Sequence, residues 1–236
     1  MRLAALGFDA DDTLWHNERF FKETEARFAG LLSDHAEPRE VQHRLIETER
    51  RNLALYGYGI KGFALSMIET AASIVPGGPP PDVVEAILGM GRDMLRHPVD
   101  LLPHAYETIR SLSESHTLVL VTKGDLFDQE RKLEASGLAE FFHGVEIVSE
   151  KTRTIYEFVF ERHGRGAEQA LMVGNSLRSD IHPALEAGAH AVHVPHRHEW
   201  ELERADVPVD NPRFHHLDHL GEMPALIERI EAGIAA

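Results

Sequence analysis

The 236-residue sequence contains no cysteine, which excludes disulfides and thiolate metal sites and gives no sign of an oxidising compartment. It also lacks any apolar run that approaches the length of a membrane-spanning helix. The apolar run at residues 3–8 is too short for a signal peptide and is followed by acids. These absences predict a cytoplasmic protein with no membrane partner.

Positive charge is also scarce. Lys and Arg total 24 against 39 Asp and Glu, which gives a formal net charge of -15. A chain this acidic disfavours sequence-independent binding to a nucleic acid polymer and docking on anionic lipid, because both need clustered basic residues. Solubility accounts for most of the acid excess. An acidic protein that handles an anionic substrate still needs local positive charge, which a metal ion could supply.

The spacing of apolar residues divides the chain into three parts. Residues 3–8 are typical of a short buried strand. Residues 18–95 contain four stretches with apolar residues at helical spacing and no convincing strand. After residue 98, strand-like runs alternate with helical ones, and the last of these runs is "AHAVHVP" at residues 189–195. This alternation predicts a parallel sheet covered on both faces. The expected fold is therefore α/β, with a helical insertion that begins at the end of the first strand and lies over the carboxyl edge of the sheet, like a lid.

Polar side chains follow four of the strand-like runs. Parallel strands end at one edge of the sheet, where such folds bind ligands, so these residues are expected to converge. Chance often scatters such residues over a surface helix, but it rarely places them at successive strand ends. The converging residues are Asp9, Asp11, Asp12 and Thr13 after "LAALGF", Thr122 and Lys123 after "HTLVLV", Lys151 after "GVEIVSE", and Asn175, Ser176 and Asp180 after "ALMVG".

This set of side chains suits phosphoryl transfer. An Asp carboxylate can act as a nucleophile and form an aspartyl phosphate. Carboxylates can share Mg2+, a hard cation that prefers oxygen ligands and screens the nucleophile from an anionic substrate. A Thr hydroxyl and backbone N–H groups can hold the transferring oxygens, and a Lys can neutralise the developing charge.

The same residues resemble the four motifs of the haloacid dehalogenase superfamily. "FDADDTLW" resembles the D-x-D-x-[TV] signature, "LVLVTKG" the second motif, Lys151 the third and "GNSLRSD" the fourth. The motifs occur in the family's order and the match covers nearly the whole chain. The resemblance implies a Rossmann-like three-layer core with a parallel sheet (residues 1–15 and 99–236) and an inserted all-helical cap domain of the C1 type (residues 16–98).

The resemblance also implies a nucleophile, an acid and a metal site. Asp9 would be the nucleophile, and Asp11 the general acid and base. The Asp9 side chain and the backbone carbonyl of Asp11 would bind Mg2+, and Asp180 would complete the site directly or through water. Many family members have an acid where this chain has Asn175, whose amide oxygen can ligate the metal or orient its water but adds no charge.

Phosphate binding would fall to other residues. Thr122, with the backbone N–H of Lys123, would bind the phosphoryl group, and Lys151 would bridge the phosphoryl group and the nucleophile. In the helical insertion, "LYGYGIKGF" at residues 55–63 is either an inter-helix turn or a loop from which Lys61 reaches an anionic substrate.

Three further features have structural explanations. Adjacent residues of an extended segment point to opposite sides, so Asp9 and Asp11 are expected to share one side while Asp12 turns away. Asp12 is expected to bond backbone N–H groups in the turn rather than to take part in catalysis. Trp15 is expected either to stack on a substrate or to pack where the core meets the lid. The histidines of "HVPHRHEW" (residues 193–200) and "FHHLDH" (residues 214–219) lack the H-E-x-x-H spacing of a zinc protease and are expected to lie exposed in loops.

The predicted function is a Mg2+-dependent phosphatase that hydrolyses a small soluble phosphomonoester, a phosphorylated metabolite, through an aspartyl phosphate. Asp11 favours this activity over that of a 2-haloacid dehalogenase, because a halide leaves without a proton whereas an alkoxide needs one. Two further functions stay open on the same fold: a phosphomutase or transferase reaction, and non-catalytic binding of a phosphometabolite. The sequence predicts neither the substrate itself nor the oligomeric state.

Overall fold

The computed structural model describes residues 2–233, which cluster into two compact units. Unit 1 comprises the described residues through Glu18, Val99–Lys123 and the described residues from Gln129 onward. Unit 2 comprises Arg19–Pro98 and Gly124–Asp128. Residues 124–128 thus cluster with the helical insertion, although the sequence prediction assigned them to the core. The role of unit 2 as a cap stays a prediction.

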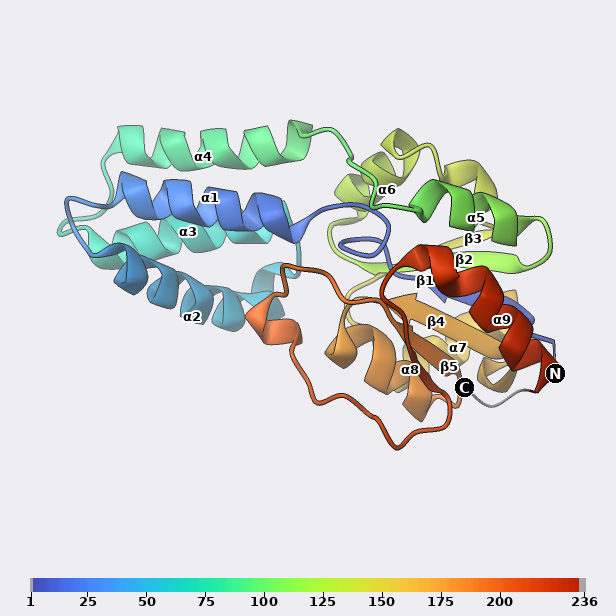
Figure 1. The fold of residues 1–236 in the computed structure, drawn as a ribbon. Helices are drawn as coiled ribbons and strands as arrows, with labels where there is room; N and C mark the ends of the chain where they lie inside the picture. The colour runs from blue at the N-terminus through green and yellow to red at the C-terminus, as the bar shows by residue number, and fades with distance from the viewer. Residues whose placement is uncertain (1, 234–236) are drawn as a thin grey trace. The chain divides into compact units, whose positions relative to one another are not determined.

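Unit 1 is built on a parallel sheet with the strand order β3-β2-β1-β4-β5-β6 (Figure 1). The first five strands were predicted from the sequence. The sixth was not, because a three-residue strand rich in histidine shows no apolar pattern. The strands are β1 (Ala5–Phe8), β2 (Thr117–Lys123), β3 (Gly144–Val148), β4 (Ala170–Gly174), β5 (His190–His193) and β6 (Phe214–His216).

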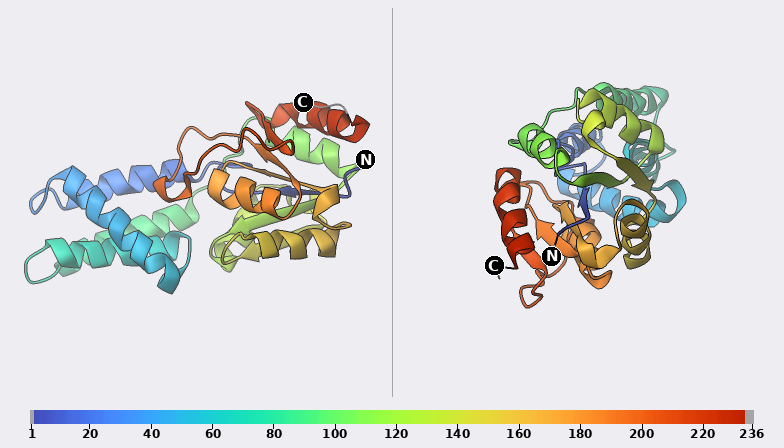
Figure 2. Two further views of the ribbon diagram at one scale, coloured as in Figure 1. Left: turned by 90° about the horizontal axis from the view of Figure 1, so that it is seen from below. Right: turned by 90° about the vertical axis from the view of Figure 1, so that its right-hand side faces the viewer.

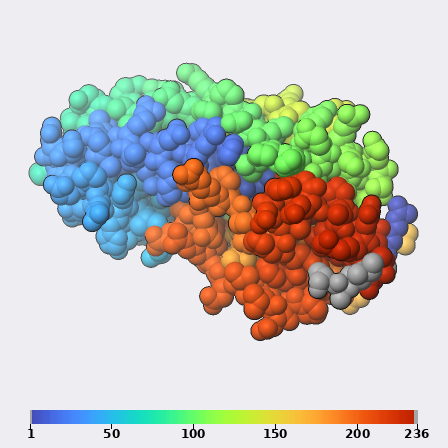
Figure 3. All heavy atoms as spheres, in the orientation of Figure 1, coloured from blue at the N-terminus to red at the C-terminus, as the bar shows by residue number. Residues whose placement is uncertain are grey.

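Helices cover both faces of this sheet, which confirms the predicted three-layer α/β core (Figure 2). Helices α5 and α9 contribute to the apolar core on one face, and α7 and α8 to the core on the other. Figure 3 shows the outer surface of α9, whose inner face is buried. The helices of this unit are α5 (Ala105–Ser113), α7 (Arg153–His163), α8 (His182–Glu186) and α9 (Met223–Ala232), together with α6 (Leu126–Ala135) from Gln129 onward. The short helical turns are η1 (Ala139–Phe141), η2 (Ala167–Gln169), η3 (Leu177–Ile181), η4 (Glu201–Glu203) and η5 (Leu220–Glu222).

Strand β1 is buried on both faces and carries the acidic motif at its carboxyl end. Leu6 and Phe8 pack into the core on the α5 and α9 side. Between them, Gly7 faces α7, where an added Cβ would lie 2.9 Å from Met172 Sδ and 3.2 Å from the Phe160 ring. Glycine therefore lets α7 pack directly against the central strand. Burial of each large apolar side chain here contributes about 1.5–3 kcal/mol.

Unit 2 consists of four helices around their own apolar core. They are α1 (Glu18–Leu31), α2 (Pro38–Tyr56), α3 (Ile60–Ile74) and α4 (Pro81–Arg96). The sequence predicted four helices in this region from the spacing of apolar residues. Their inward faces bury a shared cluster, as expected for amphipathic helices. Large members of this cluster are Phe28, Leu32, Leu45, Met67 and Ile87. No helix in residues 2–233 combines the length and apolarity needed to cross a membrane.

A pair of histidines lies between the last two strands of the sheet. His190 Nδ1 is 3.0 Å from His215 Nε2, and the two rings stack with centroids 5.3 Å apart. The Nδ1 atom of His215 is buried without a hydrogen-bond partner. Burial lowers the pKa of His215 to about 4, and the charges of His190 and Arg229 act in the same direction. Burial, followed by Arg213, also lowers the pKa of His190.

This pair predicts acid sensitivity. An unfolded histidine titrates near pH 6.5, so between about pH 6.5 and about pH 4 the unfolded chain binds a proton that folded His215 does not. The stability that neutral His215 contributes is fully present above about pH 6.5 and is lost as the pH falls toward about 4. We expect His215→Leu to show a smaller drop in Tm between about pH 7.5 and about pH 5 than the wild type. His216→Leu, on the exposed face of the same strand, should keep the wild-type drop. Equal drops in all three proteins would contradict the assignment.

Candidate active site

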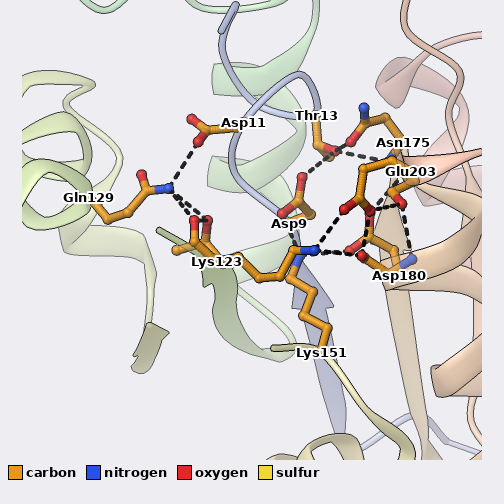
Figure 4. Close-up of polar contacts among 12 residues, drawn as sticks. Asp9, Asp11, Thr13, Lys123, Gln129, Lys151, Asn175, Asp180 and Glu203 are labelled. Carbon is orange, nitrogen blue, oxygen red and sulfur yellow. Dashed lines mark hydrogen bonds and ion pairs between the residues drawn. The ribbon is translucent and has the colours of Figure 1, made fainter. Parts of the chain in front are cut away.

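Three charged side chains meet where β1 and β4 end and the chain leaves β3 (Figure 4). Lys151 Nζ lies 2.5 Å from Asp9 Oδ1 and 2.6 Å from Asp180 Oδ1. The Lys151 and Asp180 side chains are only 2% and 1% exposed. Two carboxylates share one ammonium group, so this buried set carries net negative charge when all three are ionised. Such an arrangement is costly unless a further cation compensates it.

The electrostatics of this set reflect both its burial and its crowding. Burial raises the pKa of Asp9 to about 7, with Asp180 and Asp11 acting in the same direction and Lys151 opposing them. Burial alone would lower the pKa of Lys151, but the attraction of Asp180 and Asp9 outweighs it and raises that pKa. Lys151 therefore stays protonated, and the Asp9 carboxylate is sensitive to any further positive charge beside it.

Local geometry fixes the two carboxylates. The Asp9 N–H donates to Val173 O (2.9 Å), which continues the pairing of β1 with β4 beyond the strand end. Asp180 lies in the turn η3, and its Oδ2 accepts a hydrogen bond from the Ser176 N–H (2.9 Å). A Cβ on Gly174 would collide with Asp180 Oδ2, so glycine is required to leave room for this carboxylate.

Thr13 and Asn175 place more oxygen atoms beside the nucleophile candidate. Thr13 Oγ1 lies 3.0 Å from Asp9 Oδ2 and 3.3 Å from Asn175 Oδ1. The Asn175 N–H donates to the same hydroxyl oxygen (3.1 Å). The single Thr13 proton can be donated to either neighbour. Thr13 was noted at the strand end but given no role from the sequence; here it links the first and fourth motifs.

Asp11 and Asp12 point in different directions because the chain turns. The sequence interpretation assumed an extended segment, and this is wrong: Asp12 has a φ of 61° and its N–H donates to Trp15 O, which makes a tight turn. Asp tolerates this left-handed conformation better than most residues. The Asp12 carboxylate accepts the N–H groups of Asn17 (2.9 Å) and Glu18 (2.8 Å) at the start of α1. These bonds agree with the structural role expected for Asp12.

Asp11 is held by three donors on the other side of this turn. Its carboxylate lies 2.7 Å from Trp15 Nε1, 2.9 Å from Gln129 Nε2 and 2.6 Å from Lys132 Nζ. Asp11 therefore does not share the Lys151 contact of Asp9. Trp15 is buried in the core of unit 1 and orients Asp11, so it is not available to stack on a substrate.

Gln129 connects Asp11 to the end of β2. Its Nε2 lies 2.6 Å from Lys123 O and 3.1 Å from Thr122 Oγ1, in addition to its contact with Asp11. Neither Gln129 nor Lys132 was predicted from the sequence. They lie three residues apart on one face of α6, but polar residues at that spacing are ordinary on an exposed helix, and the burial of these two follows from tertiary packing.

The Lys123 side chain points away from these groups. Its Nζ lies 2.8 Å from Glu203 Oε1 and 2.8 Å from Ser179 Oγ. Glu203 also accepts hydrogen bonds from the hydroxyls of Ser176 (2.6 Å) and Ser179. Burial would raise the pKa of Glu203, but Lys123 and the hydroxyl donors lower it overall. Glu203 thus ties the second motif to the fourth, and no sequence pattern marks it.

Glu203→Gln should destabilise the fold, because Gln keeps the shape of the side chain but removes the charge that pairs with Lys123. We expect a loss of about 1.5–3 kcal/mol in the free energy of unfolding, measured in urea. Glu201→Gln, which replaces an exposed acid in the same short turn, should change the free energy of unfolding by less than about 0.5 kcal/mol. Equal effects of the two substitutions would contradict this role.

Lys61 belongs to unit 2. Its Nζ lies 2.9 Å from both carboxylate oxygens of Asp125, and this hydrogen bond is the main cause that lowers the pKa of Asp125. The neighbouring Gly59 has a φ of 110° and an added Cβ would lie 3.4 Å from the Asp125 N atom, so glycine permits this close approach. Contact between Lys61 and a substrate stays a prediction.

Comparison with known proteins identifies the family of the chain. Residues 3–188 match the family described as "Hydrolase: haloacid dehalogenase-like hydrolase". Among curated relatives, the HAD-hydrolase YfnB of Bacillus subtilis is 34% identical over 41% of this chain and 44% of its own length. The human N-acylneuraminate-9-phosphatase is 25% identical over 54% of this chain and 52% of its own length. The chain thus spans about half the length of these curated relatives.

Solved structures match over nearly the whole chain. A haloacid dehalogenase-like family hydrolase from Xanthomonas campestris is 36% identical, with a TM-score of 0.87 over 98% of this chain and 93% of that one. Magnesium-bound YfnB is 21% identical, with a TM-score of 0.65 over 96% of this chain and 99% of that one. The L-2-haloacid dehalogenase of Xanthobacter autotrophicus is 17% identical, with a TM-score of 0.66 over 96% of this chain and 98% of that one. At these lower identities the last two show a common fold alone.

Proposed function

The chain belongs to the haloacid dehalogenase-like hydrolases, and on this premise we propose that it is a phosphatase that hydrolyses a small phosphomonoester through an aspartyl phosphate on Asp9. The observation that carries the proposal is Asp11, two residues after Asp9 and held in place by its own donors. An alkoxide leaving group needs a proton, whereas a halide does not. A phosphatase among the curated relatives supports the same choice.

In the proposed reaction the Asp9 carboxylate attacks phosphorus and the P–O bond to the leaving group breaks. Lys151, fixed between Asp9 and Asp180, offsets the negative charge of the transferring group. Thr122 and the backbone N–H of Lys123 bind the phosphoryl oxygens. This division of roles needs no large rearrangement of the buried residues, because the ion pairs already orient them.

Asp11 exchanges the protons. It protonates the leaving oxygen as the aspartyl phosphate forms, and then takes a proton from the water that attacks phosphorus and releases phosphate. Trp15, Gln129 and Lys132 keep its carboxylate in one orientation between these steps. Unit 2 is proposed to act as a cap that excludes water during the first step, with Lys61 contacting the anionic substrate.

The residues at the site fit a Mg2+ ion. A buried set with net negative charge, built from carboxylate and amide oxygens, is the environment that this hard cation prefers. The Asp9 carboxylate, the backbone carbonyl of Asp11 and Asp180 would hold it, with Asn175 as a further oxygen donor. When bound, the ion would screen Asp9 from the anionic substrate and polarise the phosphoryl oxygens.

The proposal is tested with purified protein and an aryl phosphate. We expect phosphate release that depends on Mg2+ and is abolished by EDTA, and a panel of phosphorylated metabolites should then reveal the preferred substrate. Halide release from a 2-haloacid without phosphatase activity would replace the proposal with a dehalogenase. Binding of a phosphometabolite without turnover would replace it with a binding protein.

Asp11→Asn should lower kcat for an alkyl phosphate by about 10²–10⁴-fold, because the leaving alkoxide loses its proton donor. The loss in the rate of aspartyl phosphate formation should be smaller for an aryl phosphate, whose leaving group is stable without a proton. Pre-steady-state kinetics on both substrates measure this difference. Equal losses on the two substrates would argue against the general acid role.

A further inference from the structure

A second cluster of metal-ligating side chains lies in unit 1, outside the proposed phosphate site. His16 Nδ1 is 3.2 Å from His196 Nε2, and His196 Nδ1 is 3.2 Å from Asp12 Oδ1. The three side chains can each present a ligand atom within 4.8 Å of the others. The sequence interpretation placed His196 in an exposed loop, and this is wrong: its side chain is only 7% exposed.

The distance between the two ring nitrogens suits a shared metal ion. Two nitrogens bound tetrahedrally at about 2.0–2.1 Å from one ion are roughly 3.4 Å apart, close to the observed 3.2 Å. The ion would lie to one side of the line between the two nitrogens and would replace the contact between His16 and His196.

Asp12 provides the support that metal-binding histidines require. A histidine that binds a metal through one nitrogen usually donates its other N–H to a carboxylate, which fixes the ring and makes it a better ligand. His196 has this arrangement, with Nε2 toward His16 and Nδ1 toward both Asp12 (3.2 Å) and the backbone carbonyl of His198 (3.0 Å). The Asp12 carboxylate is itself held by the N–H groups of Asn17 and Glu18, so it is a fixed acceptor.

We propose that His16 and His196 bind a divalent transition-metal ion of the Zn2+ type, with Asp12 orienting His196 and water completing the coordination. Imidazole nitrogens select such ions over Mg2+, so this site differs in chemistry from the oxygen-lined site around Asp9. The bound ion would fasten the loop after β5 to the turn after β1. The proposal does not depend on phosphatase activity.

The test is Zn2+ binding to the full-length protein in competition with a chelating dye, with Mg2+ in excess to occupy oxygen-donor sites. We expect one equivalent to bind to the wild type. His16→Asn and His196→Asn should each weaken binding by at least about ten-fold, and Asp12→Asn by about ten-fold. Far-UV circular dichroism of each variant checks that the fold is retained.

A matched control comes from another histidine pair of the same unit. The ring centroids of His104 and His219 lie 4.6 Å apart, but within residues 2–233 no carboxylate contacts either ring as Asp12 contacts His196. His219→Asn should therefore leave Zn2+ binding unchanged. Co2+ bound to the wild type should show the visible absorption of a nitrogen-liganded ion, absent from His196→Asn. No stoichiometric Zn2+ binding to the wild type, or equal binding in the folded His16→Asn and His196→Asn variants, would overturn the proposal.

Discussion

Asp9→Asn is expected to lower kcat for aryl phosphate hydrolysis by about 10⁴-fold or more, because an amide cannot replace the carboxylate that we propose attacks phosphorus. The fold should persist. Asn has nearly the same shape as Asp: its oxygen can still accept the hydrogen bond from Lys151, and its NH2 group can donate to the Thr13 hydroxyl oxygen, where Asp9 contacts both residues in the native protein. Steady-state kinetics with thermal unfolding measures both effects on the same preparation.

Asp93→Asn provides the control for this substitution. Asp93 is an exposed acid that pairs with Arg27 at 3.3 Å in unit 2. It should keep wild-type kcat within about two-fold, since exposed ion pairs contribute little. A folded Asp9→Asn protein that turns over at the wild-type rate would remove Asp9 from the role of nucleophile.

Lys151→Met should have the largest effect on stability. It leaves the carboxylates of Asp9 and Asp180 buried beside each other without their shared ammonium group. Removing one partner of a buried ion pair destabilises a protein by about 3–5 kcal/mol, because the remaining charge has no compensation. We therefore expect this loss in the free energy of unfolding, measured in urea with EDTA present. In a separate assay with Mg2+, the variant should lack phosphatase activity.

The matched control replaces a basic residue two positions away. Arg153 pairs with Glu157 at 2.7 Å, but the two side chains are 63% and 42% exposed. Arg153→Met should therefore cost less than about 1 kcal/mol and leave activity intact. If Lys151→Met lowered the free energy of unfolding no more than Arg153→Met does, the Lys151 ammonium group would not be stabilising the buried carboxylates.

Much of the fold could be predicted because its elements bury regular apolar patterns. The run that contains Leu6 and Phe8 shows no polar alternation, as expected for a strand covered on both faces. The four helices of unit 2 show an equally regular pattern of apolar residues, at helical spacing. The sixth strand escaped prediction because His215 is buried at its centre while its neighbours are polar or partly exposed, so its position depends on pairing with β5.

The site was predictable where chemistry follows directly from a strand end. Asp9, Lys151 and Asp180 were expected to converge on that ground, and the structure brings them within hydrogen-bond distance. Their catalytic roles stay predictions. Gln129 and Glu203 could not be foreseen, because a helix face and a distant loop reach the site only through tertiary packing.

The turn after β1 was the harder part of the motif. The sequence placed Asp11 and Asp12 on opposite sides for the wrong reason, since a left-handed residue rather than strand alternation separates them. Local patterns do not reveal such a turn, whose hydrogen bonds to Trp15, Asn17 and Glu18 form only when α1 begins there.

The central claim is that the phosphoryl group is transferred to Asp9. Rapid acid quench during turnover of an aryl phosphate, followed by mass spectrometry of the peptide that contains residues 3–18, tests it most directly. The expected result is a peptide heavier by one phosphoryl group at Asp9, formed before free phosphate and absent from Asp9→Asn. Turnover without this adduct, or with the phosphoryl group on another residue, would contradict the account.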